Sequence, residues 1–487
     1  MSSTIRQKTA NGLFWSFADN LIKQCAQFVV GIILARLLSP HEFGLVGMLS
    51  FFIVISQTFI DSGFSGALIR KTDCTPIDYS TVFFFNLGIS VFLYLILFLS
   101  SGIISNFFKE PQLEKLLQVL GLGLIINAMS TIQQTILTKR IDFKLQAKIS
   151  LISSFSSGGI GIAMAYYGCG VWSLVGRTLS GFLITSILLW VLNNWKPILA
   201  FSKASFMELF GFGSKMLASR LIDAIYQNIY YLIIGKFFSV EELGFYTRAD
   251  QFKALPSQEI TSVIQSVTYP VMASLQGDPV QFKNAFQKLV KSSMFITFLL
   301  MLGMAAVAKP MVLSLLGMRW IKVVDYLQLL CFVAVFYPIH VLNLNLLSIK
   351  GRSDLYLRLE IIKKILAIPT IIIGVLISIK AMILGMLITS FVAFFFNSFW
   401  SGKLIGYSSI QQLKDIIPGF LLAVSINGSV YVIGLILHFP PTGMLIGEII
   451  LGLALAFGIC EAIKFSDYVF IKGLILEKIQ KKSSENS

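Results

Sequence analysis

Charged and amide side chains interrupt two long apolar segments of this chain, although such groups are costly in hydrocarbon. In each segment three of them follow the spacing i, i+3 and i+7, which places them on one face of a helix. We name these the first polar face, formed by Asn20, Lys23 and Gln27, and the second polar face, formed by Arg220, Asp223 and Gln227. Because such groups usually face water or a charged partner, we expect both faces to line a hydrophilic cavity that binds a polar cargo.

Other polar residues in the same or neighbouring segments could extend this lining. They are Lys215, Tyr226, Tyr230, Gln57 and Asp61. Carboxylates in transporters also bind coupling cations, so a proton or sodium gradient could drive the cargo. The carboxylates that could bind the coupling ion are Asp19, Asp223 and Glu259, and their spacing does not favour one of them.

The same groups could instead form ion pairs that hold helices together, because intramembrane ion pairs serve both purposes. Lys23 and Asp223 carry opposite charges at the middle position of their faces, which suits either role. Cysteine substitution separates the two interpretations. A membrane-impermeant thiol reagent would reach the positions of Asn20, Gln27 and Gln227 only through a water-filled cavity.

The two polar faces are related by an internal repeat. The stretch 33–44, ILARLLSPHEFG, returns as IIGKFFSVEELG at 233–244, and Leu117-Gln118-Val119-Leu120 pairs with Leu327-Gln328-Leu329-Leu330 at an offset of 210. Matches so far apart in the chain indicate two like halves. Repeated halves around a shared axis are the usual architecture of secondary transporters, with the substrate site between them.

The composition predicts an all-α polytopic membrane protein. Of the 487 residues, 56% are hydrophobic and 13% are charged, which is more apolar surface than one soluble core would bury. A membrane-spanning helix needs ~20 apolar residues, and fourteen segments qualify. These segments are 11–35, 43–60, 80–105, 114–137, 149–168, 171–193, 207–235, 254–275, 292–316, 324–348, 361–379, 381–402, 416–437 and 442–463.

The expected organisation is two six-helix bundles and two additional helices. We assign 1–193 to the N-terminal bundle, 194–206 to a cytoplasmic linker, 207–402 to the C-terminal bundle, 403–463 to the additional helices and 464–487 to a cytoplasmic tail. Residues 279–291 could be a helix on the membrane surface or an extension of the next span.

Basic residues set the orientation. Of 39 Lys and Arg, 25 lie at the termini and in even-numbered connections, 10 lie in odd-numbered connections and four lie within spans. The positive-inside rule therefore places both termini in the cytoplasm. The net charge of +15 is spread over short connections, so we expect no nucleic-acid partner.

Several chemistries lack the residues they need. Neither Gly235-Lys236 nor Gly402-Lys403 has the earlier glycine of a GxxxxGK[ST] loop, so no ATP-driven pump is indicated. We expect no enzyme, because the long extramembrane connections lack acidic or histidine clusters. The five cysteines lack CxxC spacing, so we expect no metal site or other cofactor.

The motifs resemble the polysaccharide transporter family, the Wzx-type lipid-linked oligosaccharide flippases, and are most similar to its colanic acid exporter branch. The similar stretches are 12–16, GLFWS; 35–45, ARLLSPHEFGL; 61–69, DSGFSGALI; Phe245-Tyr246 followed by Arg248-Ala249-Asp250; and Gly317 with Trp320. The resemblance covers nearly the whole chain. It implies the fold of the multidrug-efflux and lipid-flippase (MATE-like, MOP) superfamily and alternating access in a bacterial inner membrane.

The resemblance also implies a cargo: an undecaprenyl-pyrophosphate-linked repeat unit of an exopolysaccharide or O-antigen, flipped from the cytoplasmic to the outer leaflet. Lys23, Lys215 or Arg220 would then offset the pyrophosphate charge, and a polysaccharide polymerase and assembly proteins are expected partners. Two alternatives stay open. The chain could be a MATE-like efflux carrier for drugs or metabolites, or a non-transporting scaffold of a polysaccharide assembly complex.

Overall fold

The computed structural model describes residues 3–61, 63–437, 439–473 and 476, and these residues form helices and no strand. Packing divides the chain into two compact units, residues 1–247 and 248–487. The helices of the N-terminal unit are α1 (Ser3–Leu37), α2 (Pro40–Ile60), α3 (Phe64–Arg70), α4 (Pro76–Phe108), α5 (Gln112–Lys139), α6 (Phe143–Tyr166), α7 (Trp172–Leu192), α8 (Lys203–Phe237) and the first turns of α9 (Val240–Ser274).

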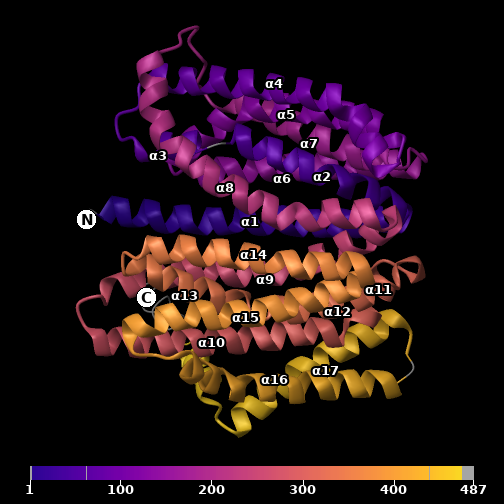
Figure 1. Ribbon diagram of the computed structural model, residues 1–487, viewed down its shortest axis with the longest axis vertical. Helices are drawn as coiled ribbons and strands as arrows, with labels where there is room; N and C mark the ends of the chain where they lie inside the picture. Colours follow the sequence, from indigo (N-terminus) through magenta and orange to yellow (C-terminus); the bar gives the residue numbers. More distant parts are fainter. Residues whose placement is uncertain (1–2, 62, 438, 474–475, 477–487) are drawn as a thin grey trace. The chain divides into compact units, whose positions relative to one another are not determined.

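The C-terminal unit contains the remainder of α9 and all later elements. These are α10 (Pro279–Ala306), α11 (Ala308–Leu315), the 3-10 helix η1 (Met318–Trp320), α12 (Val323–Ala334), α13 (Tyr337–Ile349), α14 (Ser353–Ile377), α15 (Ile379–Ile405), α16 (Ser409–Ile436) and α17 (Pro441–Ala462). Within each unit the long helices run roughly along one common direction (Figure 1).

Each of the fourteen predicted spans lies mostly in helix, and ten helical segments of the described residues are long and apolar enough to cross a membrane. The number of fourteen spans stays a prediction. Two predicted spans are broken: 292–316 comprises α10 and α11, and 324–348 comprises α12 and α13. Pro338, which lies in the first turn of α13, accounts for the second break because proline cannot donate a helical hydrogen bond. Residues 279–291 are the first turns of α10, so the extension of the next span is the correct alternative.

The helix starts follow local sequence signals. Pro40 opens α2 directly after Ser39, and the Glu42 carboxylate accepts a hydrogen bond from the Ser39 backbone N–H at 2.6 Å. At the start of α9, 200 residues later, the Glu242 backbone N–H donates to the Ser239 hydroxyl at 3.2 Å. Both stretches therefore turn sharply into a capped helix after only two connecting residues.

The two capped helices cross at glycines. A Cβ atom on Gly44 would lie 1.9 Å from the Val240 carbonyl oxygen, and one on Gly244 would lie 1.9 Å from the Pro40 carbonyl oxygen. Any side chain at either position would collide with fixed backbone. The contact is reciprocal. Gly44 of α2 meets Val240, the first residue of α9, and Gly244 of α9 meets Pro40, the first residue of α2.

Residues 193–202, within and beside the predicted linker, carry no helix and are bonded to the N-terminal unit. The Ile198 backbone N–H donates to the Ser80 hydroxyl at 2.9 Å, and the Ser202 N–H donates to the Thr81 hydroxyl at 3.0 Å. The Gln133 side-chain amide donates to the Trp195 carbonyl at 3.0 Å. Side chains of α4 and α5 therefore satisfy backbone groups of the connection that leads into α8.

Candidate functional site

The first polar face lies on the exposed side of α1. Asn20, Lys23 and Gln27 are all exposed, as expected for residues on one helical face. Asp19 is buried beside them, and the Lys23 ammonium pairs with its carboxylate at 2.7 Å. The second oxygen of Asp19 is buried without a hydrogen-bond partner. Lys23 therefore provides the charge that compensates a buried carboxylate, which is costly to leave unpaired.

The second polar face lies on α8. Arg220, Asp223 and Gln227 are exposed, and Lys215, one to two turns earlier, is exposed as well. Tyr226 is half-buried and Tyr230 is buried, so the two tyrosines mark the edge where α8 packs on its neighbours. Exposed charges near the middle of a 35-residue helix are consistent with a hydrated surface.

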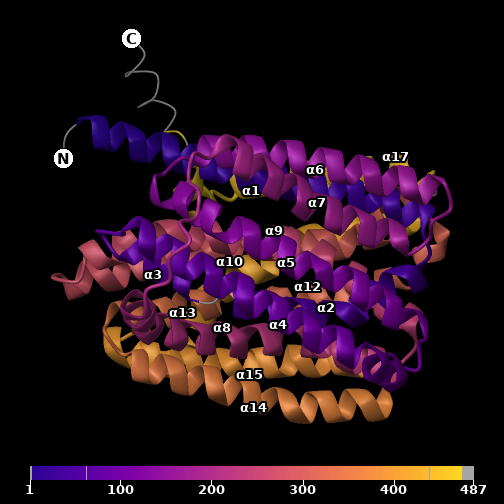
Figure 2. The same cartoon turned by 90° about the horizontal axis from the view of Figure 1, so that it is seen from above.

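The N-terminal unit contains both polar faces. α1 packs along α6, whereas α8 packs along α2, α3 and α4. Figure 2 shows the same arrangement from above, with α1 beside α6 and α8 near α4. The faces therefore project from two helices that have different packing partners. That they line one common cavity stays a prediction.

The carboxyl end of α2 carries two more of the predicted residues. Asp61 follows the last turn of α2, where the positive charge of Arg220 on α8 acts on its carboxylate. Gln57, one turn earlier, lines a cavity of about 210 Å³ between α2, α5 and α7. Glu259 lies in α9, and its side chain is outside the described residues.

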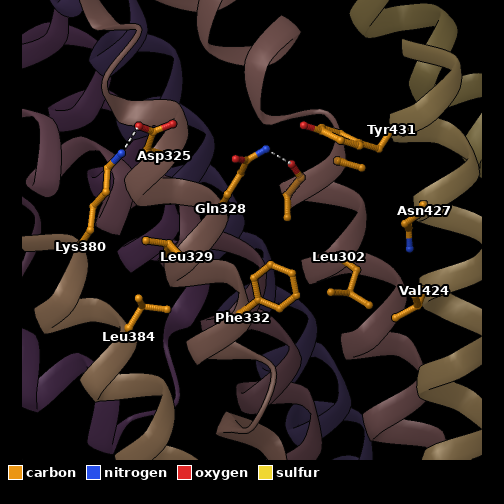
Figure 3. Close-up of a pocket in the computed structure, with 13 residues that line it drawn as sticks. Leu302, Asp325, Gln328, Leu329, Phe332, Lys380, Leu384, Val424, Asn427 and Tyr431 are labelled. Carbon is orange, nitrogen blue, oxygen red and sulfur yellow. Dashed lines mark hydrogen bonds and ion pairs between the residues drawn. The ribbon is translucent and has the colours of Figure 1, made fainter. Parts of the chain in front are cut away.

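A larger cavity lies inside the C-terminal unit, where sequence analysis predicted none. It has a volume of about 650 Å³ and lies between α10, α12, α15 and α16 (Figure 3). Apolar side chains make up most of its wall. The polar residues that line it are Asp325, Gln328, Lys380, Asn427 and Tyr431. A weaker signal was present, because Asp325 and Gln328 share the spacing i and i+3 of the two polar faces, although Phe332 at i+7 is apolar.

A buried polar network lies elsewhere in this unit. His340 contacts the Ser390 hydroxyl at 3.0 Å and the Asn397 amide at 3.1 Å through its two ring nitrogens. Asn343 donates to the Gln412 side chain at 3.1 Å. Because both ring nitrogens of His340 are satisfied by neutral groups, the network suits a structural histidine.

A cluster of ionisable groups combines Tyr407, in the connection between α15 and α16, with Lys291 of α10, Asp415 in the second turn of α16 and Asp467 after α17. The Tyr407 hydroxyl donates to Asp415 at 2.7 Å, and Lys291 pairs with Asp415 at 3.2 Å. Burial, followed by the Asp415 carboxylate, raises the pKa of Tyr407. Burial also raises the pKa of Asp467, although the charge of Lys291 opposes this shift. In the part of the chain that the structure describes, no group of three or more His, Cys, Asp or Glu residues could hold a metal ion.

Comparison of the sequence with known proteins identifies a matching family and several similar proteins. The family described as "Polysaccharide biosynthesis protein" matches residues 33–325. The teichuronic acid biosynthesis protein TuaB of Bacillus subtilis (strain 168) is 28% identical over 357 residues, 72% of this chain and 73% of that protein. The lipopolysaccharide biosynthesis protein WzxC of Escherichia coli (strain K12) is 25% identical over 434 residues, 88% of this chain and 83% of that protein.

Solved structures show a similar fold at low identity. The lipid II flippase MurJ in an inward closed conformation has a TM-score of 0.76 and 15% identity, covering 94% of this chain and all of that one. An inward-facing multidrug resistance MATE transporter of the MOP superfamily has a TM-score of 0.62 and 16% identity, covering 80% of this chain and 98% of that one. These matches confirm the predicted resemblance to the polysaccharide transporter family. The chain belongs to the polysaccharide biosynthesis protein family, as a multi-pass bacterial membrane protein with the MOP-type fold.

Proposed function

We propose that this protein flips undecaprenyl-pyrophosphate-linked oligosaccharide repeat units of an exopolysaccharide or O-antigen from the cytoplasmic to the outer leaflet, by alternating access. The observation that carries the proposal is the exposure of both polar faces, on α1 and α8, in a chain that shares its fold with a lipid II flippase. The similarity to TuaB and WzxC, which are named for teichuronic acid and lipopolysaccharide biosynthesis, supports the class of cargo.

The physical barrier to such a cargo explains why charged faces are retained in a membrane protein. Each hydroxyl moved bare into hydrocarbon costs ~4 to 8 kcal/mol, so a sugar head group faces tens of kcal/mol. A hydrated groove lined by amides and charges removes most of this barrier. The polyprenyl tail can remain in the bilayer while the head group passes through the groove.

Lys23 and Arg220 are the residues that we assign to the pyrophosphate, with Lys215 as a further cation. Lys23 is exposed, so a pyrophosphate can replace Asp19 as its partner. That exchange leaves the buried Asp19 carboxylate uncompensated, and a proton or a sodium ion would then neutralise it. Head-group binding would thus create the site for the coupling ion.

The proposal has three further parts. The chain consists of two like halves, both of its termini lie in the cytoplasm, and it interacts with a polysaccharide polymerase and assembly proteins. The reciprocal contacts of Gly44 with Val240 and of Gly244 with Pro40 support the repeat, because a two-fold relation produces such exchanged pairs. The contact also offers a way to close one side, because the starts of α2 and α9 approach each other there at backbone distance.

A deletion strain tests the proposal. Sugar-loaded carrier lipid should accumulate on the cytoplasmic face, as measured by its protection from an externally added glycan-labelling enzyme. The intact chain should reverse the accumulation, and Arg220→Ala at wild-type membrane abundance should not. Lys203→Ala is the matched control, because Lys203 is an exposed cation at the start of the same helix, away from the second polar face.

Other outcomes of the deletion would support the alternatives. Drug sensitivity without carrier-lipid accumulation would favour an efflux carrier, and the MATE-like fold gives that alternative its structural basis. Loss of partner enzymes from the membrane, rescued equally by the Arg220→Ala variant, would favour a scaffold.

A further inference from the structure

The cavity in the C-terminal unit is graded from polar to apolar along the helix axes. Asp325 and Lys380 lie in the first turns of α12 and α15, at one end of the helical layer. Leu384 is four residues beyond Lys380 and Phe332 is seven beyond Asp325, which places them about 6 Å and 10 Å deeper along their helices. Figure 3 shows this order, with Asp325, Gln328 and Tyr431 in one row and Leu384, Phe332 and Leu302 in another.

This gradient matches the amphipathic profile of a membrane lipid. The volume of about 650 Å³ is within the range of small-molecule sites. Its wall is open along α15 and α16, where Leu384 and Val424 are 45% and 41% exposed. A lipid chain could therefore enter sideways while its head group stays at the level of Asp325 and Lys380.

The polar end of the cavity carries one charge of each sign. The Lys380 ammonium pairs with the Asp325 carboxylate at 2.6 Å, and both side chains are about half exposed. The two charged residues that line the cavity sum to zero, so a dianionic pyrophosphate would be left with uncompensated charge. A head group that carries both a phosphate and a primary ammonium would instead exchange partners with the pair, phosphate to Lys380 and ammonium to Asp325.

We infer that the cavity between α10, α12, α15 and α16 binds a zwitterionic phospholipid with an ammonium head group, that is, a phosphatidylethanolamine. Its phosphate contacts Lys380, its ammonium contacts Asp325, and one acyl chain lies against Leu384, Phe332 and Val424. This site is separate from the two polar faces, which lie in the other unit. It does not depend on the identity of the cargo.

Photocrosslinking tests the inference on the full-length chain in nanodiscs of mixed phosphatidylethanolamine and phosphatidylglycerol. Either lipid carries a diazirine on its acyl chain, and mass spectrometry of peptides locates the adducts. We expect adducts on the cavity-lining parts of α12, α15 and α16, with phosphatidylethanolamine favoured about fivefold. Equal labelling by the two lipids, or adducts confined to other helices, would contradict the inference.

Two sets of variants separate chain binding from head-group selection. Val424→Trp should fill part of the cavity and lower the adduct yield, whereas Leu421→Trp should not, because Leu421 is exposed on the same helix but does not line the cavity. The double variant Asp325→Asn/Lys380→Gln keeps the cavity and should remove only the preference between lipids. This double variant decides the question if Val424→Trp does not fold.

Competition identifies the occupant. Undecaprenyl pyrophosphate added at the same molar ratio as the photoreactive lipid should leave the adducts unchanged. If it displaces phosphatidylethanolamine, the cavity binds the carrier lipid and the inference is wrong.

Discussion

The ion pair of Lys23 with Asp19 shows how one exposed cation can serve both structure and transport. The buried carboxylate requires a positive charge, while the exposed ammonium remains available to a head group. Lys23 can therefore fulfil both roles considered for the first polar face, lining a cavity and forming a structural ion pair. The two roles differ in what substitution of Asp19 should produce.

At Lys23, substitution by alanine should lower flipping about tenfold, because one charge-assisted contact to the head group is lost. Asp19→Asn removes the need for a counter-charge, so Lys23→Ala/Asp19→Asn should recover protein stability but not flipping. Flipping is measured by carrier-lipid accumulation, and stability by thermal unfolding of the purified protein. Recovery of flipping in the double variant would show that Lys23 acts only by pairing with Asp19.

Asp467 gives a prediction for pH. Its folded-state pKa is raised by burial, so its contribution to stability is largest below the unfolded pKa and is lost as the pH rises through the folded value. Asp467→Asn should therefore raise the unfolding temperature at pH 7 and leave it nearly unchanged at pH 4. Asp73→Asn, on the exposed connection before α4, should change neither. An equal gain at both pH values would exclude titration of Asp467 as the cause.

Among the elements, the crossing of α2 and α9 is sterically constrained at two glycines. Gly44→Ala and Gly244→Ala should each destabilise the protein by about 1 to 3 kcal/mol, because a methyl group would collide with a carbonyl oxygen. Gly88→Ala in α4 is the control: nothing lies near its Cβ position, so alanine should stabilise by about 0.4 to 1 kcal/mol. Thermal unfolding in detergent measures all three.

If the starts of α2 and α9 separate during transport, the glycine variants should also favour the conformation in which these two helix starts lie apart. Labelling of a cysteine at Ser39 by a membrane-impermeant reagent would then increase in Gly244→Ala. Unchanged labelling alongside lower stability would limit the glycines to a packing role.

The positions of the helices could be predicted from the sequence because apolar runs are local signals. The apolar run alone placed the second span at 43–60, and the cap formed by Ser39, Pro40 and Glu42 would have moved its start to Pro40. The break before α13 was missed although Pro338 was visible, because the apolar run continues through it. The cavity at Asp325 and Lys380 was missed for another reason: its walls come from four helices, and one sequence does not specify which helices adjoin.

For the whole molecule, orientation in the membrane is the prediction that remains to be measured. With both termini in the cytoplasm, a fluorescent protein fused after residue 487 should fluoresce and a periplasmic phosphatase fused there should be inactive. The phosphatase inserted in the connection before Pro441 should be active, because α16 and α17 would join outside. The opposite pattern would invert the assignment of cargo entry and exit.

The bonded connection over 193–202 has a consequence for protein engineering. Because Ser80, Thr81 and Gln133 hold its backbone against α4 and α5, its covalent continuity contributes little to where α8 sits. The chain can therefore be split near Leu199, which is 94% exposed. The two fragments should associate in the bilayer and restore export when they are co-expressed.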